Sequence, residues 1–392
     1  MCKLYERRLR LARGRAFPYK LSIAPDIAVA AFALQSDASP GMLCLLQRIL
    51  LMELVAQVLA GERGAIARLI SLMERGGEQA RQALAELYPH TGRAHIIGIT
   101  GAPGTGKSTL VNELAKAYRK QGLTVGIVAV DPTSPFSGGA ILGDRIRMRD
   151  LAADAGIFIR SMATRGSLGG LARATADAVH VLDAAGYPII LVETVGAGQS
   201  EVDIARTAHT TIVVGMPAAG DDIQAIKAGI LEIADILVVN KADLPGADHA
   251  VAALHAMLDL NAGRAEWHHG QLQHVEGVVV DAAGTAVAWR PPVLKTVATR
   301  GEGIIELAGA VQNHLQYQVR SGLKERRERE RAAEGLLRIL RHTLLERLLN
   351  QIPNADLERT VQRIVAREQD PYSAAEALIS VMLSEARYSC TT

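Results

Sequence analysis

The sequence predicts an α/β fold in which a mostly parallel sheet is covered by helices on both faces. Two observations support this: short runs of Val, Ile and Leu alternate with stretches of helical periodicity, and the first run leads into a glycine-rich loop. Near-continuous apolar strands are typical of parallel sheets that are buried on both faces. We expect strands at residues 96–100, 124–130, 156–161, 188–192, 210–215, 236–239 and 293–296.

The first of these runs ends in a phosphate-binding loop. Residues 101–108 fit the pattern G-x-x-x-x-G-K-[ST], whose glycines let backbone N–H groups surround phosphate oxygens at a helix N-terminus. Lys107 is expected to reach the β- and γ-phosphates, and the Ser108 hydroxyl to bind Mg²⁺. An apolar-periodic helix follows and ends at Gly122, so the pattern predicts a P-loop NTPase. The expected phosphate-binding residues are Gly101, Ala102, Pro103, Gly104, Thr105, Gly106, Lys107, Ser108 and Thr109.

A second motif predicts which base is bound. A buried-strand pattern at residues 236–239 leads into Asn240-Lys241-x-Asp243. An aspartate at the end of a strand can accept hydrogen bonds from guanine N1–H and N2–H₂ together, whereas adenine would leave it unpaired. We expect Asn240 to tie this loop to the phosphate loop and the Lys241 stem to cover the base. A weaker signal follows the last strand, where backbone N–H groups are expected to contact guanine O6: Thr296, Val297 and Ala298.

Acidic residues follow two further strands at the same edge of the expected sheet. Asp131 ends the second strand, and Asp144 lies on a Gly/Ser/Pro-rich segment that can rearrange. Glu193 ends the fourth strand, and we expect the Gly196 N–H to bond the γ-phosphate. Carboxylates there can hold Mg²⁺ directly or through water, although an Asp-Pro turn and an exposed aspartate are the plainer interpretation of the first two. The expected metal ligands are Ser108, Asp131, Asp144 and Glu193, and the expected catalytic groups are Lys107, Glu193 and Gly196.

Composition excludes several classes of function. The 43 basic and 41 acidic residues nearly balance, so no overall charge attracts nucleic acid or a membrane surface. Aromatic residues make up only 4% of the chain, which argues against base-stacking surfaces. The three cysteines lack metal-ligand spacing, and no run of eighteen apolar residues could span a bilayer, so we expect reduced thiols and a cytoplasmic location.

We expect four parts along the chain. Residues 1–51 are a basic extension, either a poorly ordered tail, which we favour, or a targeting segment that would imply the mitochondrial matrix. Residues 52–92 carry two amphipathic helices broken by Gly61 and Gly76-Gly77. Residues 93–318 form the nucleotide-binding domain, with an irregular insertion at 262–292. The insertion contains three histidines that we interpret as part of a solvated loop and not as a metal site: His268, His269 and His274.

The fourth part, residues 319–392, is expected to be a helical arm. Residues 320–331 are strongly charged, and four leucines then recur at helical spacing: Leu337, Leu340, Leu344 and Leu348. Either this helix packs on its own domain, or the arm reaches a second subunit. We favour the homodimer, because a charged stretch separates the apolar stripe from the sheet.

Three longer motifs together resemble the methylmalonyl-CoA mutase-associated GTPases of the MeaB/ArgK group. They lie at residues 131–144, 193–201 and 220–227, and the resemblance covers roughly residues 52–318. It implies GTP and Mg²⁺ as ligands, a homodimer formed through the arm, and a chaperone or gatekeeper role toward an adenosylcobalamin-dependent acyl-CoA mutase. It also implies switch segments that couple nucleotide state to the partner, and in these we single out Gln199, Asp222, Gln224 and Lys227. The chain departs from the group at residues 296–298, where Ser-Ala is commoner.

Two other functions compete with this one. A GTPase that serves another metal-centre enzyme, such as hydrogenase or urease, would usually carry a His- or Cys-rich tract, for which His268-His269 is poor support. A kinase would need an acceptor-site base, and none is identifiable. No arginine finger stands out, although Arg145, Arg147 and Arg149 are near the loops, so we expect slow GTP hydrolysis that a partner stimulates. The sequence does not name the client mutase.

Overall fold

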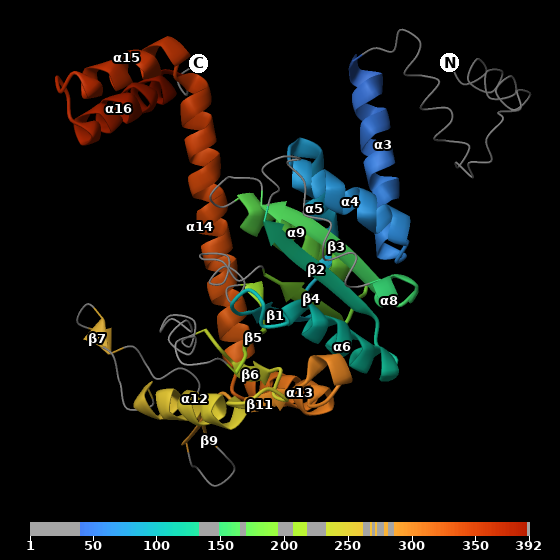
Figure 1. Cartoon of the computed structure of the whole chain (residues 1–392). Coiled ribbons are helices and arrows are strands. Elements are labelled where there is room, and N and C mark those ends of the chain that lie inside the picture. The colour runs from blue at the N-terminus through green and yellow to red at the C-terminus, as the bar shows by residue number, and fades with distance from the viewer. Residues whose placement is uncertain are drawn as a thin grey trace, which may run out of the picture. The chain divides into compact units, whose positions relative to one another are not determined.

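The computed structural model describes residues 40–132, 149–164, 170–194, 207–217, 233–261, 267–268, 271–272, 278–280 and 286–389. The chain divides into two compact units at residues 321 and 322, close to the boundary expected at residue 319 (Figure 1). No helix within the described ranges is long and apolar enough to cross a membrane.

The first unit is built on a seven-stranded parallel sheet, so the predicted α/β fold is confirmed (Figure 1). The strand order is β11-β6-β5-β1-β4-β2-β3. Each strand matches one of the seven expected apolar runs. Their bounds are β1 His95–Thr100, β2 Val125–Pro132, β3 Ile157–Thr164, β4 Ile189–Glu193, β5 Thr210–Gly215, β6 Ile236–Asn240 and β11 Val293–Thr296.

The register of the central strands brings the loops of the site to one edge. Glu193, the last residue of β4, lies opposite Ile99 of β1 and Ala129 of β2. Because the strands are parallel, the loops that leave their carboxyl ends meet there, as ligand-binding loops do in open α/β sheets.

Helices cover both faces of the sheet. On one face, α6 Lys107–Lys120 and α13 Ile304–Arg320 bury their apolar sides against β1, β5 and β6. On the other, α9 Gly170–Ala184 packs on β2 and β4, and α12 Ala247–Asn261 packs on β5 and β6. Apolar side chains on alternate positions of the same strands point to opposite faces, which is why the strands read as continuous apolar runs.

From residue 40, where the described part of the chain begins, the segment before the sheet contains three helices instead of the two expected. They are α3 Pro40–Leu59, α4 Arg63–Arg75 and α5 Glu78–Leu87, followed by the 3-10 turn η1 Tyr88–His90. The breaks fall at the expected glycines, whose positive φ angles are 78° at Gly61, 71° at Gly76 and 92° at Gly77. Helix α3 begins at Pro40, so the boundary expected at residue 52 falls inside a helix.

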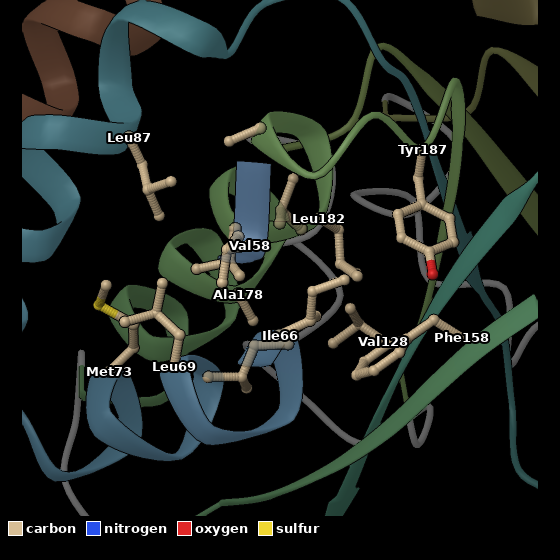
Figure 2. Close-up of a cluster of buried hydrophobic side chains, with 14 of the residues drawn as sticks. Val58, Ile66, Leu69, Met73, Leu87, Val128, Phe158, Ala178, Leu182 and Tyr187 are labelled. Atoms are coloured by element: carbon tan, nitrogen blue, oxygen red, sulfur yellow. The ribbon is translucent and has the colours of Figure 1, made fainter. Parts of the chain in front are cut away.

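These helices form one apolar cluster with α9 and the sheet (Figure 2). Side chains of α4, including Ile66, Leu69 and Met73, point toward Ala178 and Leu182 of α9. The same cluster includes Leu51 and Val58 of α3 and, from the sheet, Val128, Phe158 and Val192. The helical segment is therefore part of the core that supports α9 and β2.

The described parts of the insertion at 262–292 contain short strands, which the sequence did not predict. Strand β7 Trp267–His268 pairs with β8 Gln271–Leu272, and β9 Val278–Val280 pairs with β10 Ala286–Ala288, both antiparallel. Beyond them, Trp289 donates from its indole N–H to the backbone oxygen of Asp235 at 2.8 Å. The end of the insertion is thus tied to the start of β6.

The second unit consists of α14 Leu323–Gln351, α15 Asn354–Val365 and α16 Pro371–Ser389 (Figure 1). The charged stretch and the leucine stripe belong to one continuous helix, α14. Three leucines of the stripe stay open to solvent, with exposed fractions of 51% at Leu337, 46% at Leu340 and 64% at Leu344. Within its own unit, then, α14 does not bury this face.

Candidate nucleotide-binding site

The phosphate loop follows β1 and has a shape that only glycine allows at two positions. Gly101 has a φ of 142°, and a Cβ there would lie 2.1 Å from the backbone oxygen of Val214. Gly106 has a φ of 90°, and a Cβ there would lie 2.4 Å from Nδ2 of Asn240. Both glycines combine a left-handed backbone with a close approach, so any side chain would force the loop off β5 or off the base loop.

Lys107, the first residue of α6, is buried with its ammonium folded over the loop. Its Nζ donates to the backbone oxygens of Gly101 at 2.8 Å and Ala102 at 3.0 Å. A buried ammonium requires such partners because it has left water. These carbonyls hold the ammonium against the first residues of the loop.

Ser108 and Glu193 form the next layer of the site. The Ser108 hydroxyl donates to Oε1 of Glu193 at 2.7 Å, and Glu193 is buried at the end of β4. The next residue, Thr194, donates from its backbone N–H to the oxygen of Ile99 at 3.1 Å and from its hydroxyl to Oγ1 of Thr100 at 3.0 Å. The strand end that carries Glu193 is thereby fixed against β1.

This hydroxyl and carboxylate are hard oxygen donors that suit Mg²⁺, which takes one or two protein ligands and completes its shell with phosphate and water. The described part of the chain holds no group of three or more His, Cys, Asp or Glu that could bind a metal alone. Asp131 lies within β2, opposite Ala163 of β3, but its side chain and the whole of Asp144 lie outside the described residues.

Asn240 bonds to the phosphate loop, where the sequence predicted a link, and also to the second base loop, where it did not. Its Nδ2 donates to the backbone oxygen of Thr105 at 2.8 Å. Its Oδ1 accepts from the Thr296 hydroxyl and from the backbone N–H of Ala298, each at 3.1 Å. All four residues are buried. One amide therefore sets the position of three loops.

The residues expected to read the base follow Asn240 directly. Lys241 adopts a left-handed backbone, with a φ of 57°, and its Nζ lies 3.9 Å from the sulfur of Met216. Oδ2 of Asp243 lies 3.4 Å from Nη2 of Arg300. The sequence analysis did not single out Arg300, which lies two residues after the second base loop and ends the short turn η2 Ala298–Arg300.

Several expected site residues lie outside the described residues: Asp144, Gly196, Gln199, Asp222, Gln224 and Lys227. The same holds for Arg145, Arg147, His269 and His274, while Arg149 begins the short helix α8 Arg149–Ala152 and His268 is described only in its backbone. The structure thus brings together the phosphate loop, Glu193 and the base loops.

A family comparison decides the identity of this arrangement. The family described as "Methylmalonyl Co-A mutase-associated GTPase MeaB" matches residues 66–352. The chain belongs to the MeaB family. The predicted resemblance is confirmed, and the match extends beyond residue 318 through α14. Membership of a GTPase family implies that the chain binds a guanine nucleotide.

Relatives of this MeaB-family chain carry related names. A Pyrococcus abyssi protein with a provisional GTPase name is 47% identical over 331 residues, which are 84% of this chain and 96% of that protein. GTPase ArgK of Escherichia coli is 33% identical over 314 residues, 79% of this chain and 88% of that protein. The mouse protein named methylmalonic aciduria type A homolog, mitochondrial, is 32% identical over 294 residues, 74% of this chain and 65% of that protein.

A solved structure supports the fold. The crystal structure of LAO/AO transport system kinase superposes with a TM-score of 0.61 at 24% identity, covering 85% of this chain and 97% of that one. At this identity the likeness concerns the architecture and carries no statement about substrate.

Proposed function

We propose that this chain hydrolyses GTP and acts as a chaperone or gatekeeper for an adenosylcobalamin-dependent acyl-CoA mutase of the methylmalonyl-CoA mutase type. The observation that supports this most is the match over residues 66–352 to a family described by its association with that mutase. The name of the mouse relative points in the same direction.

In this proposal the chain's own groups hold the nucleotide. Lys107 would exchange the carbonyls of Gly101 and Ala102 for phosphate oxygens, which keeps its buried charge paired. Ser108 and Glu193 would hold Mg²⁺ with Asp131 and Asp144 as further ligands, and the ion would neutralise charge on the phosphates. Gly196 would donate its N–H to the γ-phosphate, and Asp243 would accept from guanine.

The affinity for the mutase would depend on the bound nucleotide through four switch residues: Gln199, Asp222, Gln224 and Lys227. A switch of this kind requires that the GTP and GDP forms differ in affinity for the mutase, since a ligand shifts an equilibrium only by its differential binding. Glu193 supports the proposal, because the hydrogen bond to Ser108 places the carboxylate beside the phosphate loop and one residue before Thr194, where the chain leaves the sheet.

We also propose a homodimer through α14. The half-exposed leucines Leu337, Leu340 and Leu344 support it, because burying them against a second copy would remove apolar area from water. The family match continues to residue 352 and so includes all of α14.

Nucleotide binding and phosphate release test the first half of the proposal. We expect GTP and GDP to bind much more tightly than ATP in the presence of Mg²⁺, and we expect slow release of inorganic phosphate from GTP. Transfer of the γ-phosphate to an added acceptor in place of water would identify a kinase and overturn the hydrolase assignment.

Co-purification with an acyl-CoA mutase tests the second half. The tagged chain, loaded with GDP or a non-hydrolysable GTP analogue, is mixed with a methylmalonyl-CoA or an isobutyryl-CoA mutase. We expect nucleotide-dependent retention of one mutase and a slower loss of its activity during turnover. Equal retention in both nucleotide states, or retention of neither mutase, would contradict the gatekeeper role while leaving the GTPase intact.

A further inference from the structure

The guanidinium of Arg300 forms an ion pair with Asp243, the carboxylate that is proposed to bind guanine. Nη2 of Arg300 lies 3.4 Å from Oδ2 of Asp243, and Nη1 lies 3.8 Å from Oε1 of Glu302. The guanidinium therefore lies between the carboxylates of Asp243 and Glu302. Its side chain is 59% exposed, so it can move without disturbing the core, whereas the side chain of Asp243 is only 33% exposed.

The backbone around Arg300 is fixed. Val297 and Glu302 form an antiparallel bridge, with the N–H of Val297 donating to the oxygen of Glu302 at 3.1 Å. The N–H of Arg300 donates to the oxygen of Val297 at 2.9 Å. A Cβ on Gly303 would lie 2.2 Å from the oxygen of Lys295, so this turn is closely packed on β11. A rearrangement of Arg300 would therefore involve its side chain and not the backbone of this turn.

Guanine and Arg300 make conflicting demands on Asp243. Guanine presents two parallel N–H donors, and a carboxylate satisfies both by using both oxygens. The guanidinium takes one of those oxygens. A base that offers only N1–H, such as hypoxanthine, needs one oxygen and can bind Oδ1 while Arg300 keeps Oδ2. Guanine must displace the arginine, and Glu302 offers it a second carboxylate.

We propose that Arg300 is a specificity-determining gate at the base site, which competes with guanine for Asp243 and turns to Glu302 when guanine binds. The inference rests on the proposed guanine-reading role of Asp243. It makes two substitutions act in opposite directions. Arg300→Ala removes the competitor and tightens guanine nucleotide binding, whereas Glu302→Gln removes the alternative partner and weakens it.

The expected changes are modest because the ion pair is largely exposed. Exposed pairs of this kind contribute little, so removing the competitor tightens GDP binding by about two- to fivefold at low salt. IDP, with its single N1–H donor, gains less than GDP. At about 1 M salt the Debye length falls to about 3 Å, and the affinities of wild type and variant converge.

The experiment measures the affinities of GDP and IDP for the full chain by calorimetry, at about 0.05 M and about 1 M salt. The matched control is Arg290→Ala, which removes another exposed arginine. Its Nη2 lies 2.7 Å from Oδ1 of Asp259, and the residue precedes β11, whereas the second base loop follows the carboxyl end of that strand. We expect no change in affinity from it. Arg300→Gln serves as a second variant if the alanine variant melts early.

Two results would overturn the gate: weaker GDP binding by Arg300→Ala, which would make Arg300 a clamp on bound nucleotide, or an unchanged GDP affinity at low salt. Failure of the proposed function would look different. If wild type bound ADP as tightly as GDP, Asp243 would not read guanine at all. If wild type preferred GDP and Asp243→Asn removed that preference, only the role of Arg300 would remain to be decided by the two outcomes above.

Discussion

Asn240 joins the phosphate loop to the base loops, and the loss of stability on its removal can be calculated from its hydrogen bonds. Asn240→Ala removes three buried hydrogen bonds, one to Thr105 at 2.8 Å and two from Thr296 and Ala298 at 3.1 Å. At about 1 kcal/mol of net stability per hydrogen bond, the loss is about 3 kcal/mol. A domain of this size loses about 2–4 °C per kcal/mol, so the melting temperature falls by about 6–12 °C. GDP affinity falls as well, because the loops lose their common anchor.

The matched control is Asn112→Ala in α6. Asn112 is also buried, but its Oδ1 accepts no hydrogen bond from the part of the chain that the structure describes. Its removal should cost less than about 1 kcal/mol, since no donor among the described residues loses Oδ1 as its acceptor. Thermal unfolding by circular dichroism and GDP titration measure both variants. If Asn240→Ala melted within about 2 °C of wild type, or no lower than Asn112→Ala, the anchoring role would be refuted.

Three further outcomes follow from the site and the arm. Lys107→Ala should abolish GTP binding or hydrolysis with an unchanged circular dichroism spectrum, and retained phosphate release would remove the loop lysine from the mechanism. Asp243→Asn should weaken GTP binding sharply and shift preference toward XTP, whose base offers a carbonyl where guanine has an amino group; an unchanged GTP-to-ATP ratio would show that the base is read elsewhere. Truncation after Ser321 should give a monomer in light scattering that still binds GTP, because the nucleotide loops lie upstream; a monomeric full chain at micromolar concentration would contradict the dimer.

The strands were predictable because their signal is local. Every residue of β4 and β6 is buried, and the first four residues of each strand are all apolar. The carboxyl ends of parallel strands meet at one edge, so Glu193 and Asn240 could be assigned to one site from their positions after such runs. The apolar runs predicted the strands, and the rule that the carboxyl ends of parallel strands meet at one edge predicted where the site lies.

The start of α3 was not predictable in the same way. In the helix from Pro40 to Leu59 the apolar residues are spread around the whole circumference, so no 3.6-residue pattern separates a buried from an exposed face. Leu45 and Ile49 are 60% and 51% exposed although Leu51 is buried. The sequence therefore showed a clean helical pattern only from residue 52 onward, and the expected boundary was placed too late.

Arg300 shows a different limit. Its partner Asp243 lies on another loop, and an arginine in a polar turn is unremarkable in a sequence. Asn240 was predictable because its role depends on a motif of fixed spacing, whereas the role of Arg300 depends on how the turn after Ala298 folds back.

The two nucleotide motifs depend on each other through one contact. The motif for the phosphate loop requires glycine at residue 106 because φ is positive there, and the structure adds a second reason. A Cβ on Gly106 would lie 2.4 Å from Nδ2 of Asn240, the atom that donates to Thr105. A side chain at residue 106 would therefore displace the amide that holds the loops at Thr296 and Ala298. The base motif therefore also requires glycine at residue 106, and the phosphate loop and the base loops cannot change independently of each other.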